Sequence, residues 1–365
     1  MTSDAFRILG GQSGSFKVPN LFLPKSLDNH GNYIVSLGEL SNWMGEQAEE
    51  LGVDIFAGFS ADELLWNDRK QVTGIVTADM GIGKDGQRKG NFQAGMNIKA
   101  KQVVLAEGCR GSLSERVISE FNLRKNCDPQ SYGIGLKEVW QVPEENMVPG
   151  LVEHTVGWPL ESNVYAGSFM YHMGPNLIHL GLVLGLDYKN PYLNPYEEFQ
   201  KWKTHESVKK YLKNGTCLKY GARALNEGGF FSIPRLTFPG GVMVGCSAGF
   251  LDISKIKGSH NAIKSGAVAA ESLYEKMALA EYFPEEGAEV RSYEDNLKKT
   301  DVWSSLHSTR NFKGGFKAGL WGGLTQGAVV SFITKGREGW NLRNSGTDSS
   351  KTEPASKFTV RFFRG

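Results

Sequence analysis

A strand, a glycine-bracketed turn and a helix built from small residues follow one another between residues 242 and 270, and this unit constrains the fold most strongly. The apolar run 242–244 predicts a buried strand that ends between Gly245 and Gly249. The helix that begins at Gly258-Ser259 is rich in alanine and glycine, so its axis can lie close to a sheet. A helix N-terminus presents unpaired N–H donors and about half a positive charge. The unit predicts either a cradle for an electron-rich cofactor such as reduced flavin, or a strand–turn–helix that binds nothing.

The candidate cofactor-binding residues of this unit lie in the turn and at the helix start. They are Gly245, Cys246, Ser247, Gly249, Gly258, Ser259 and His260. His260 could donate to a flavin carbonyl, or it could cap or pack. Asn226, in the stretch Ala-Leu-Asn-Glu-Gly-Gly, is a further candidate, and an ordinary turn asparagine is an equal alternative.

A second strand also ends in a turn that contains glycine and few large side chains. The run Val103-Val-Leu-Ala is followed by Glu-Gly-Cys-Arg-Gly, which predicts a strand and a tight turn at Ala106, Glu107 and Gly108. Many α/β turns look alike, so this turn alone does not identify a ligand site. Together with the 245–249 turn, it predicts two strand ends on one side of a sheet. The helix start at 258 is expected to converge on them. Gly81-Ile-Gly-Lys-Asp-Gly matches the dinucleotide fingerprint by letter, but no helix start follows it, so we interpret it as a polar loop.

Charge and cysteine usage exclude several function classes. The 365 residues carry 41 Lys and Arg against 39 Asp and Glu, so no nucleic-acid partner is implied. The four cysteines are scattered without a C-x-x-C pair, which argues against a disulfide framework and a local metal site, and no metal ligand is assigned. Free thiols are typical of a reducing compartment such as the cytosol or the mitochondrial matrix.

The run 318–334 is uncharged over 17 residues, glycine-rich, and flanked by Lys317, Lys335 and Arg337. It is short for a membrane span of about 20 residues. It could form a buried core helix, a helix lying in one membrane leaflet, or a true span; the basic flanks favour contact with anionic head groups. The apolar loop 16–24 could be a second membrane-facing element or a loop that covers the core.

Elsewhere, periodicity predicts several further elements. Helices are expected at 40–51, from about 113, at 195–213 and near 291–312, strands at 53–56, 71–77 and 98–106, and antiparallel strands at 133–139, 165–171 and 177–184. The polar tail from about Asn341 is expected to be disordered.

Six stretches of this sequence resemble the electron transfer flavoprotein–ubiquinone oxidoreductase family, with a likeness that extends from about residue 5 to about residue 345. These stretches are His30-Gly-Asn-Tyr-Ile-Val, Trp43-Met-Gly-Glu-Gln-Ala-Glu, Tyr132-Gly-Ile-Gly-Leu-Lys-Glu, His154-Thr-Val-Gly-Trp-Pro-Leu, Tyr220-Gly-Ala-Arg-Ala-Leu-Asn-Glu-Gly-Gly and Lys255-Ile-Lys-Gly-Ser-His.

The resemblance implies an FAD enzyme, monotopic on the matrix face of the mitochondrial inner membrane. Such an enzyme takes electrons singly from reduced electron transfer flavoprotein and passes them in pairs to ubiquinone. Ala166 and Gly167 match the Gly-Gly backbone that meets the quinone in the family, and the alanine is a departure. The segments 16–24 and 314–335 match its membrane elements. The family's opening FAD fingerprint and the four ligands of its [4Fe–4S] cluster have no counterpart here, so we expect a chain truncated at both ends whose own activity is in doubt.

We therefore predict an α/β (α+β) fold: an incomplete FAD-binding three-layer fold of the glutathione-reductase type, with an inserted antiparallel-sheet ubiquinone domain and a membrane-surface helix. The expected divisions are a membrane-facing loop or hairpin at 1–28, FAD-domain parts at 29–131 and 235–312, the ubiquinone domain at 132–234, the membrane-associated helix at 313–340 and a disordered tail at 341–365. Two alternatives remain: a flavin-dependent monooxygenase or isoprenoid reductase, and a cofactor-free truncated isoform or fragment.

Overall fold

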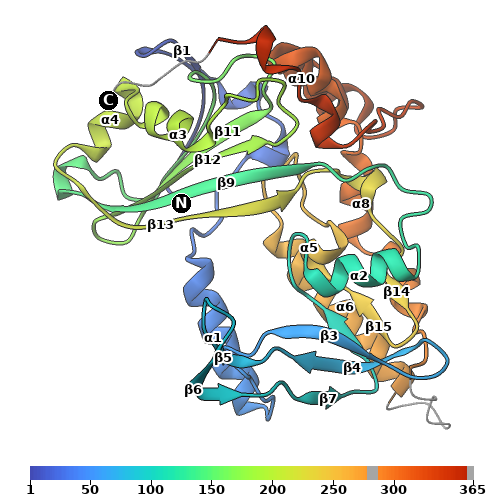
Figure 1. Cartoon of the computed structure of the whole chain (residues 1–365). Helices are drawn as coiled ribbons and strands as arrows, with labels where there is room; N and C mark the ends of the chain where they lie inside the picture. The colour runs from blue at the N-terminus through green and yellow to red at the C-terminus, as the bar shows by residue number, and fades with distance from the viewer. Residues whose placement is uncertain (278–286, 360–365) are drawn as a thin grey trace.

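A seven-stranded sheet fills the upper part of the view in Figure 1. The computed structural model describes residues 1–277 and 287–359. The strand order is β13 (Thr216–Asn226), β9 (Tyr132–Gln141), β12 (Leu177–Gly185), β11 (Ala166–Met173), β10 (Leu151–Gly157), β1 (Ser3–Gly10) and β2 (Gly14–Val18). Only the pair β1 and β10 is parallel; the others are antiparallel. The antiparallel strands predicted from the sequence are therefore confirmed, and the N-terminal hairpin extends the same sheet.

Helices α3 (Pro195–Lys203) and α4 (Glu206–Leu212) pack on this sheet. The rings of Phe199 and Trp202 stack and are buried against the apolar side chains of β12. The sequence predicted one helix over 195–213, but the chain breaks at His205. The side chain of His205 accepts a hydrogen bond from the Ser207 N–H and so caps the start of α4.

A small mixed sheet and the helices packed on it form the core of the second part of the molecule. Here β14 (Thr237–Phe238), β15 (Gly241–Met243) and β8 (Val103–Leu105) form a three-stranded sheet, covered by α2 (Ser112–Glu120), α5 (Gly245–Ala248), α6 (Ser259–Met277), α7 (Ser292–Lys298) and α8 (Asp301–Ser308). Strand β15 pairs in parallel with β8, with Val242 opposite Val104. The expectation that the strands ending near Ala106 and Gly245 share one sheet is thus confirmed.

A smaller layer lies beside this core (Figure 1). It contains β3 (Ala61–Trp66), β4 (Val72–Thr77) and β7 (Asn97–Lys99), and the hairpin of β5 (Met80–Ile82) and β6 (Arg88–Gln93). The single strand predicted over 98–106 is two strands, because β7 pairs with β4 whereas β8 pairs with β15. Residues 53–56, predicted as a strand, have no strand partner.

Helix α1 (Leu37–Glu50) forms where helical periodicity predicts it, yet none of its residues is buried. Its apolar face, which includes Trp43 and Met44, is exposed. Strand β8 is likewise at the edge of its sheet, with Val104 44% exposed. Amphipathic patterning thus located α1 correctly, but the described residues leave its apolar face exposed.

The run predicted as a membrane-associated helix forms α9 (Phe312–Gly315), a 3-10 turn (Phe316–Ala318), α10 (Gly319–Ala328) and a π-helical turn (Val329–Thr334). Figure 1 places α10 at the same end of the molecule as β1. Within the described ranges, no helix combines the length and apolar character that crossing a membrane requires.

Residues 341–359 lie against the body of the protein, which differs from the disorder expected from their composition. The Leu342 N–H donates to Asn311 Oδ1, and the guanidinium of Arg343 pairs with Asp128 at 2.8 Å. A 3-10 turn (Asp348–Lys351) follows, and Phe358 and Thr359 border a surface pocket near Pro159. These contacts compensate for the low hydrophobicity of the segment; its last part, 360–365, lies outside the described residues.

Candidate functional site

The two glycine-containing turns predicted to bind a cofactor, 106–108 after β8 and 245–249 after β15, contact each other; they are called the two bare corners below. Ser247 Oγ donates to the carbonyl of Gly108 at 3.3 Å, so the turn after β15 touches the turn after β8. Gly108 has a φ of +79°, and a Cβ placed there would meet nothing within 4 Å. Gly249 has a φ of +87°. Both glycines are needed for the backbone conformation, and the open space at Gly108 allows close approach of a ligand.

The start of α6 packs against the second corner. The Gly245 N–H donates to Ser265 Oγ at 3.0 Å, and Gly245 lies beside Ala262. The predicted convergence of the two corners with the helix start is therefore observed. Burial, the main cause, and the positive charge of Lys255 lower the pKa of His260.

Glu107 and Asn226 use their side chains differently. The Glu107 carboxylate accepts hydrogen bonds from the Leu113 and Ser114 N–H groups and so caps α2, which leaves only its backbone for a cofactor. Asn226 ends β13 and is buried, and its Oδ1 has no hydrogen-bond partner among the residues that the structure describes. A buried amide oxygen without a donor is costly, so this atom marks a place where a ligand N–H or O–H fits.

The turns after β8 and β15 each carry a free cysteine, Cys109 and Cys246. Burial and the neighbouring Cys246 raise the pKa of Cys109 to about 11, and burial raises the pKa of Cys246. Both thiols are free and stay protonated at neutral pH. In the described part of the chain, the group with metal-ligand spacing is Asp4, Asp28 and His30, which contains no cysteine, so the residues present do not fit an iron–sulfur cluster.

A cavity of about 800 Å³ joins the start of α6 to the seven-stranded sheet. Gly258, Ser259 and His260 line it on one side, and Ala166 and Gly167 of β11 line it on the other. A Cβ placed on Gly167 would meet its nearest atom, the Thr155 carbonyl oxygen, at 3.6 Å, so the backbone there is open to a ligand with little room to spare. The predicted quinone position and the predicted cofactor helix therefore face a common space.

The walls of this cavity are mostly apolar and come from the two segments predicted to contact the membrane. They include Val18, Phe22, Leu23 and Leu27 from the N-terminal segment, and Phe312, Phe316, Leu324, Ala328 and Phe332 from the 312–332 segment. Large apolar side chains of the same segments are also exposed at the surface: Phe16, Leu21, Phe22, Trp321, Phe332 and Ile333. A shape of this kind suits a hydrophobic ligand that enters from an apolar phase.

Sequence reasoning missed the charged and aromatic members of the cavity wall. Glu227 lines it, next to the candidate Asn226, and Tyr165 lines it next to the candidate Ala166. The alternation of side chains along a strand could have separated Leu225 and Glu227 from Asn226. The lysine that pairs with Glu227 is Lys313, and no spacing rule connects positions 86 residues apart.

Comparisons with known proteins agree with the geometry. Residues 132–225 match the family model "ETF-QO, ubiquinone-binding". The chain is 48% identical over 365 residues to the human mitochondrial electron transfer flavoprotein-ubiquinone oxidoreductase, covering 98% of this chain and 59% of that protein. It is 49% identical over 339 residues to the Arabidopsis thaliana protein of the same name, covering 92% and 52%. The chain thus spans less than two thirds of the length of these relatives.

Solved structures of other proteins share the fold. A geranylgeranyl bacteriochlorophyll reductase-like protein from Thermoplasma acidophilum superposes with a TM-score of 0.58 at 15% identity, covering 84% of this chain and 70% of that one. A flavoprotein/dehydrogenase from Cytophaga hutchinsonii gives 0.53 at 16% identity, covering 86% and 69%. The fold is therefore the α/β fold of FAD-dependent oxidoreductases. With the sequence matches, these findings confirm the resemblance: the chain is a homologue of the electron transfer flavoprotein-ubiquinone oxidoreductases.

Proposed function

We propose that this protein binds FAD at the junction of its two bare corners with α6 and transfers electrons from reduced electron transfer flavoprotein to ubiquinone held in the cavity. The observation that carries the proposal is the single cavity that is bordered both by Gly258–His260 and by Ala166–Gly167. The proposed fold is an incomplete glutathione-reductase-type FAD domain formed by 29–131 and 235–312, with the ubiquinone domain at 132–234 inserted between them.

The residues present fit a flavin. The open space at Gly108, the unpartnered Oδ1 of Asn226 and the N-terminus of α6 supply room, an acceptor and a positive pole. The proposed binding residues are Ala106, Glu107, Gly108, Asn226, Gly245, Cys246, Ser247, Gly249, Gly258, Ser259 and His260. When bound, FAD supplies the reversible exchange of one or two electrons. The α6 N-terminus favours negative charge on the ring, and the apolar cavity excludes water.

Ubiquinone would enter through the apolar segments. The backbone of Ala166 and Gly167 would position its ring, and the walls from 18–27 and 312–332 would hold its isoprenoid tail. The exposed Leu21, Phe22, Trp321 and Ile333 would then lie in one leaflet at the matrix face of the mitochondrial inner membrane, with 313–340 as the membrane-associated segment.

The test uses the complete 365-residue chain. Purified protein should show the visible absorbance of bound flavin after incubation with FAD, should bind a short-chain ubiquinone by calorimetry, and should bleach when reduced electron transfer flavoprotein is added. A colourless protein that still binds the quinone would support a cofactor-free fragment. Bleaching by NAD(P)H instead would support the monooxygenase or isoprenoid-reductase alternative.

A further inference from the structure

A carboxylate lies in the wall of the mostly apolar cavity. Glu227 lines the cavity with its side chain only 4% exposed to solvent. A Cβ placed on Gly185, at the end of β12, would lie 3.5 Å from both Glu227 Oε2 and the ring of Tyr165, the residue that precedes Ala166 and Gly167. Reduction of ubiquinone to ubiquinol consumes two protons, and a cavity closed by apolar side chains must obtain them through particular groups.

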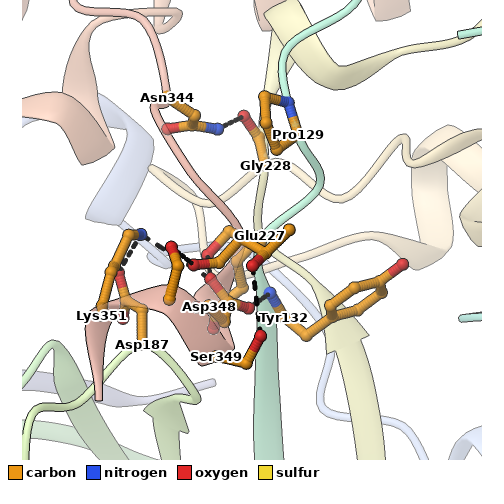
Figure 2. Close-up of polar contacts among 12 residues, drawn as sticks. Pro129, Tyr132, Asp187, Glu227, Gly228, Asn344, Asp348, Ser349 and Lys351 are labelled. Carbon is orange, nitrogen blue, oxygen red and sulfur yellow. Dashed lines mark hydrogen bonds and ion pairs between the residues drawn. The ribbon is translucent and has the colours of Figure 1, made fainter. Parts of the chain in front are cut away.

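A chain of polar groups connects Glu227 to the surface. Lys313 Nζ lies 3.4 Å from Glu227 Oε2 and donates to Ser131 Oγ at 2.6 Å. Ser131 Oγ donates to Asp348 Oδ1 at 2.9 Å. Lys351 Nζ lies 3.7 Å from that same oxygen and 3.0 Å from Asp187 Oδ2. Figure 2 shows Asp348, Lys351 and Asp187 gathered beside Glu227.

The route runs from buried groups, including Ser131 with 2% of its surface exposed, to a partly exposed lysine. The side chain of Glu227 is 4% exposed, those of Lys313 and Asp348 are each 11% exposed, and that of Lys351 is 30% exposed. The groups come from different parts of the fold: β13 leads into Glu227, α9 carries Lys313, Ser131 precedes β9, and Asp348 lies in the C-terminal segment. The contacts therefore form a continuous route from bulk water to the cavity.

The surroundings of Glu227 are suited to proton exchange. Burial, the largest cause, raises its pKa against the lowering effect of Lys313, and the carboxylates of Asp187 and Asp348 raise it further. Tyr165 and Cys109, which also face Glu227, are held protonated by burial. Lys313 is the cation whose charge and hydrogen bond lower the pKa of this carboxyl.

We propose that Glu227 delivers protons to ubiquinone as it is reduced in the cavity, and that Lys313, Ser131 and Asp348 reload Glu227 from solvent. The inference rests on the proposed function, because it requires ubiquinone at Ala166 and Gly167. It adds a proton path, which the electron-transfer role does not itself specify.

The steps balance. Ubiquinone plus two electrons from reduced flavin plus two protons gives ubiquinol. As negative charge develops on a quinone oxygen, the O–H bond of the Glu227 carboxyl breaks and the quinol O–H bond forms. The resulting carboxylate takes a proton from the Lys313 ammonium, and the Lys313 amine takes one from solvent through Ser131 and the Asp348 end of the route. A second cycle supplies the second proton.

Three other titratable groups on the cavity wall, His154, Tyr165 and Tyr171, are poorer donors. Burial and Lys257 lower the pKa of His154 to about 4, so it carries no spare proton at neutral pH. Burial raises the pKa of Tyr165 well above its ordinary value and that of Tyr171 to about 12, which makes both phenols reluctant acids.

The test is redox-difference infrared spectroscopy on the full chain with a short-chain ubiquinone bound, reduced at an electrode so that flavin content does not limit the measurement. Wild-type protein should show a carboxylic-acid carbonyl band that changes on quinone reduction. Glu227→Gln should abolish this band, and Glu227→Asp should restore a shifted one. In the flavin-loaded protein, Glu227→Gln should slow quinol formation about 100-fold while reduction by electron transfer flavoprotein is unchanged.

Glu138→Gln is the matched control, because Glu138 is also a buried carboxylate paired with a lysine, Lys203 at 2.7 Å, and lies outside the cavity wall. It should keep the band and the rate. If Glu227→Gln does not fold, Ser131→Ala, which leaves the Glu227–Lys313 pair intact, should keep the band and slow quinol formation.

The outcomes separate the two proposals. A wild-type protein that does not bind the short-chain ubiquinone would contradict the proposed function. Normal binding with the same band in wild type and Glu227→Gln, or a wild-type rate in Ser131→Ala, would overturn the proton path alone.

Discussion

The backbone of Gly245 lies against the side chain of Ala262, such that a Cβ atom on Gly245 would come within 3.2 Å of the Ala262 Cβ. Gly245 also has a φ of +57°, where side chains are disfavoured. We expect Gly245→Ala to destabilise the protein by about 1–3 kcal/mol and to weaken FAD binding, because α6 must move away from the corner. Chemical denaturation and flavin titration measure both effects.

Gly266→Ala is the control for this change. It lies in the same helix, and a Cβ there meets nothing within 4 Å. It should be neutral or stabilise by up to about 1 kcal/mol. Equal destabilisation by both substitutions would contradict the close-packing argument.

Gly167 tests the quinone position. A methyl group fits there in ordinary van der Waals contact, with 3.6 Å to the nearest atom. Gly167→Ala should therefore fold normally and bind short-chain ubiquinone almost as well as the wild type. Gly167→Leu should project into the cavity and weaken binding at least tenfold, which corresponds to about 1.4 kcal/mol. Calorimetry on both variants measures the difference, and unchanged affinity in Gly167→Leu would place the quinone elsewhere.

Membrane contact is expected to depend on Trp321. Its side chain is 64% exposed in α10, next to the apolar wall of the cavity. Trp321→Ala should lower the affinity for vesicles that contain anionic lipid, because an indole ring contributes buried area at the interface. Trp43, similarly exposed on α1, supplies the comparison. Vesicle co-sedimentation should show a clear loss for Trp321→Ala and little change for Trp43→Ala; equal losses would contradict a localised membrane face.

Acid should destabilise the fold through His154. Its pKa falls from the usual 6.5 to about 4, mainly because it is buried. Between these two pH values, His154 is protonated in the unfolded chain but neutral in the folded chain. The free energy of unfolding therefore keeps its full value above pH 6.5 and falls as the pH is lowered towards 4. The full effect is about 3 kcal/mol. Denaturation of His154→Gln across this range should show a flatter pH profile; a profile as steep as that of the wild type would assign the effect to other groups.

The C-terminal segment should be held by Asp348. Its carboxylate accepts hydrogen bonds from the Tyr132 N–H at 2.7 Å and from Ser131 Oγ. Asp348→Ala leaves both donors without this partner, and we expect a loss of about 1–3 kcal/mol together with faster hydrogen exchange over 341–359. Glu353→Ala, which removes only exposed ion pairs with Lys189 and Lys357, should change little. Similar exchange in both variants would show that Asp348 does not anchor the segment.

Local patterns predicted those parts of the fold that depend on near neighbours in sequence. The strand before Gly245, the helix from Ser259 and the alternating strands of the ubiquinone region follow from periodicity and glycine placement. The break at His205 was missed because it depends on a side-chain cap and on contact with the carbonyl of Gly14, far away in the chain. The packing of 341–359 was missed because the contacts that hold it to the body of the protein, such as Arg343 with Asp128, are long-range.

Some parts of the candidate site were predicted from the sequence and others were missed, again because local patterns do not reveal long-range contacts. Glycine-rich turns are visible in the sequence, so the approach of the Gly108 turn to the Gly245 turn could be predicted before the fold was known; that they hold a ligand stays a prediction. Glu227, in contrast, is an ordinary acidic residue until β13 places it in the cavity wall and α9 brings Lys313 to it. Its significance arises from burial, which a single sequence does not reveal.

The edge position of β8 has a consequence for how the molecule behaves at high concentration. A strand with one unpaired side offers its backbone amides and carbonyls to any extended segment that approaches. Because β8 is at the edge of its sheet and Val104 is exposed, β8 is a template on which a foreign strand, or the same strand of another molecule, can continue the sheet.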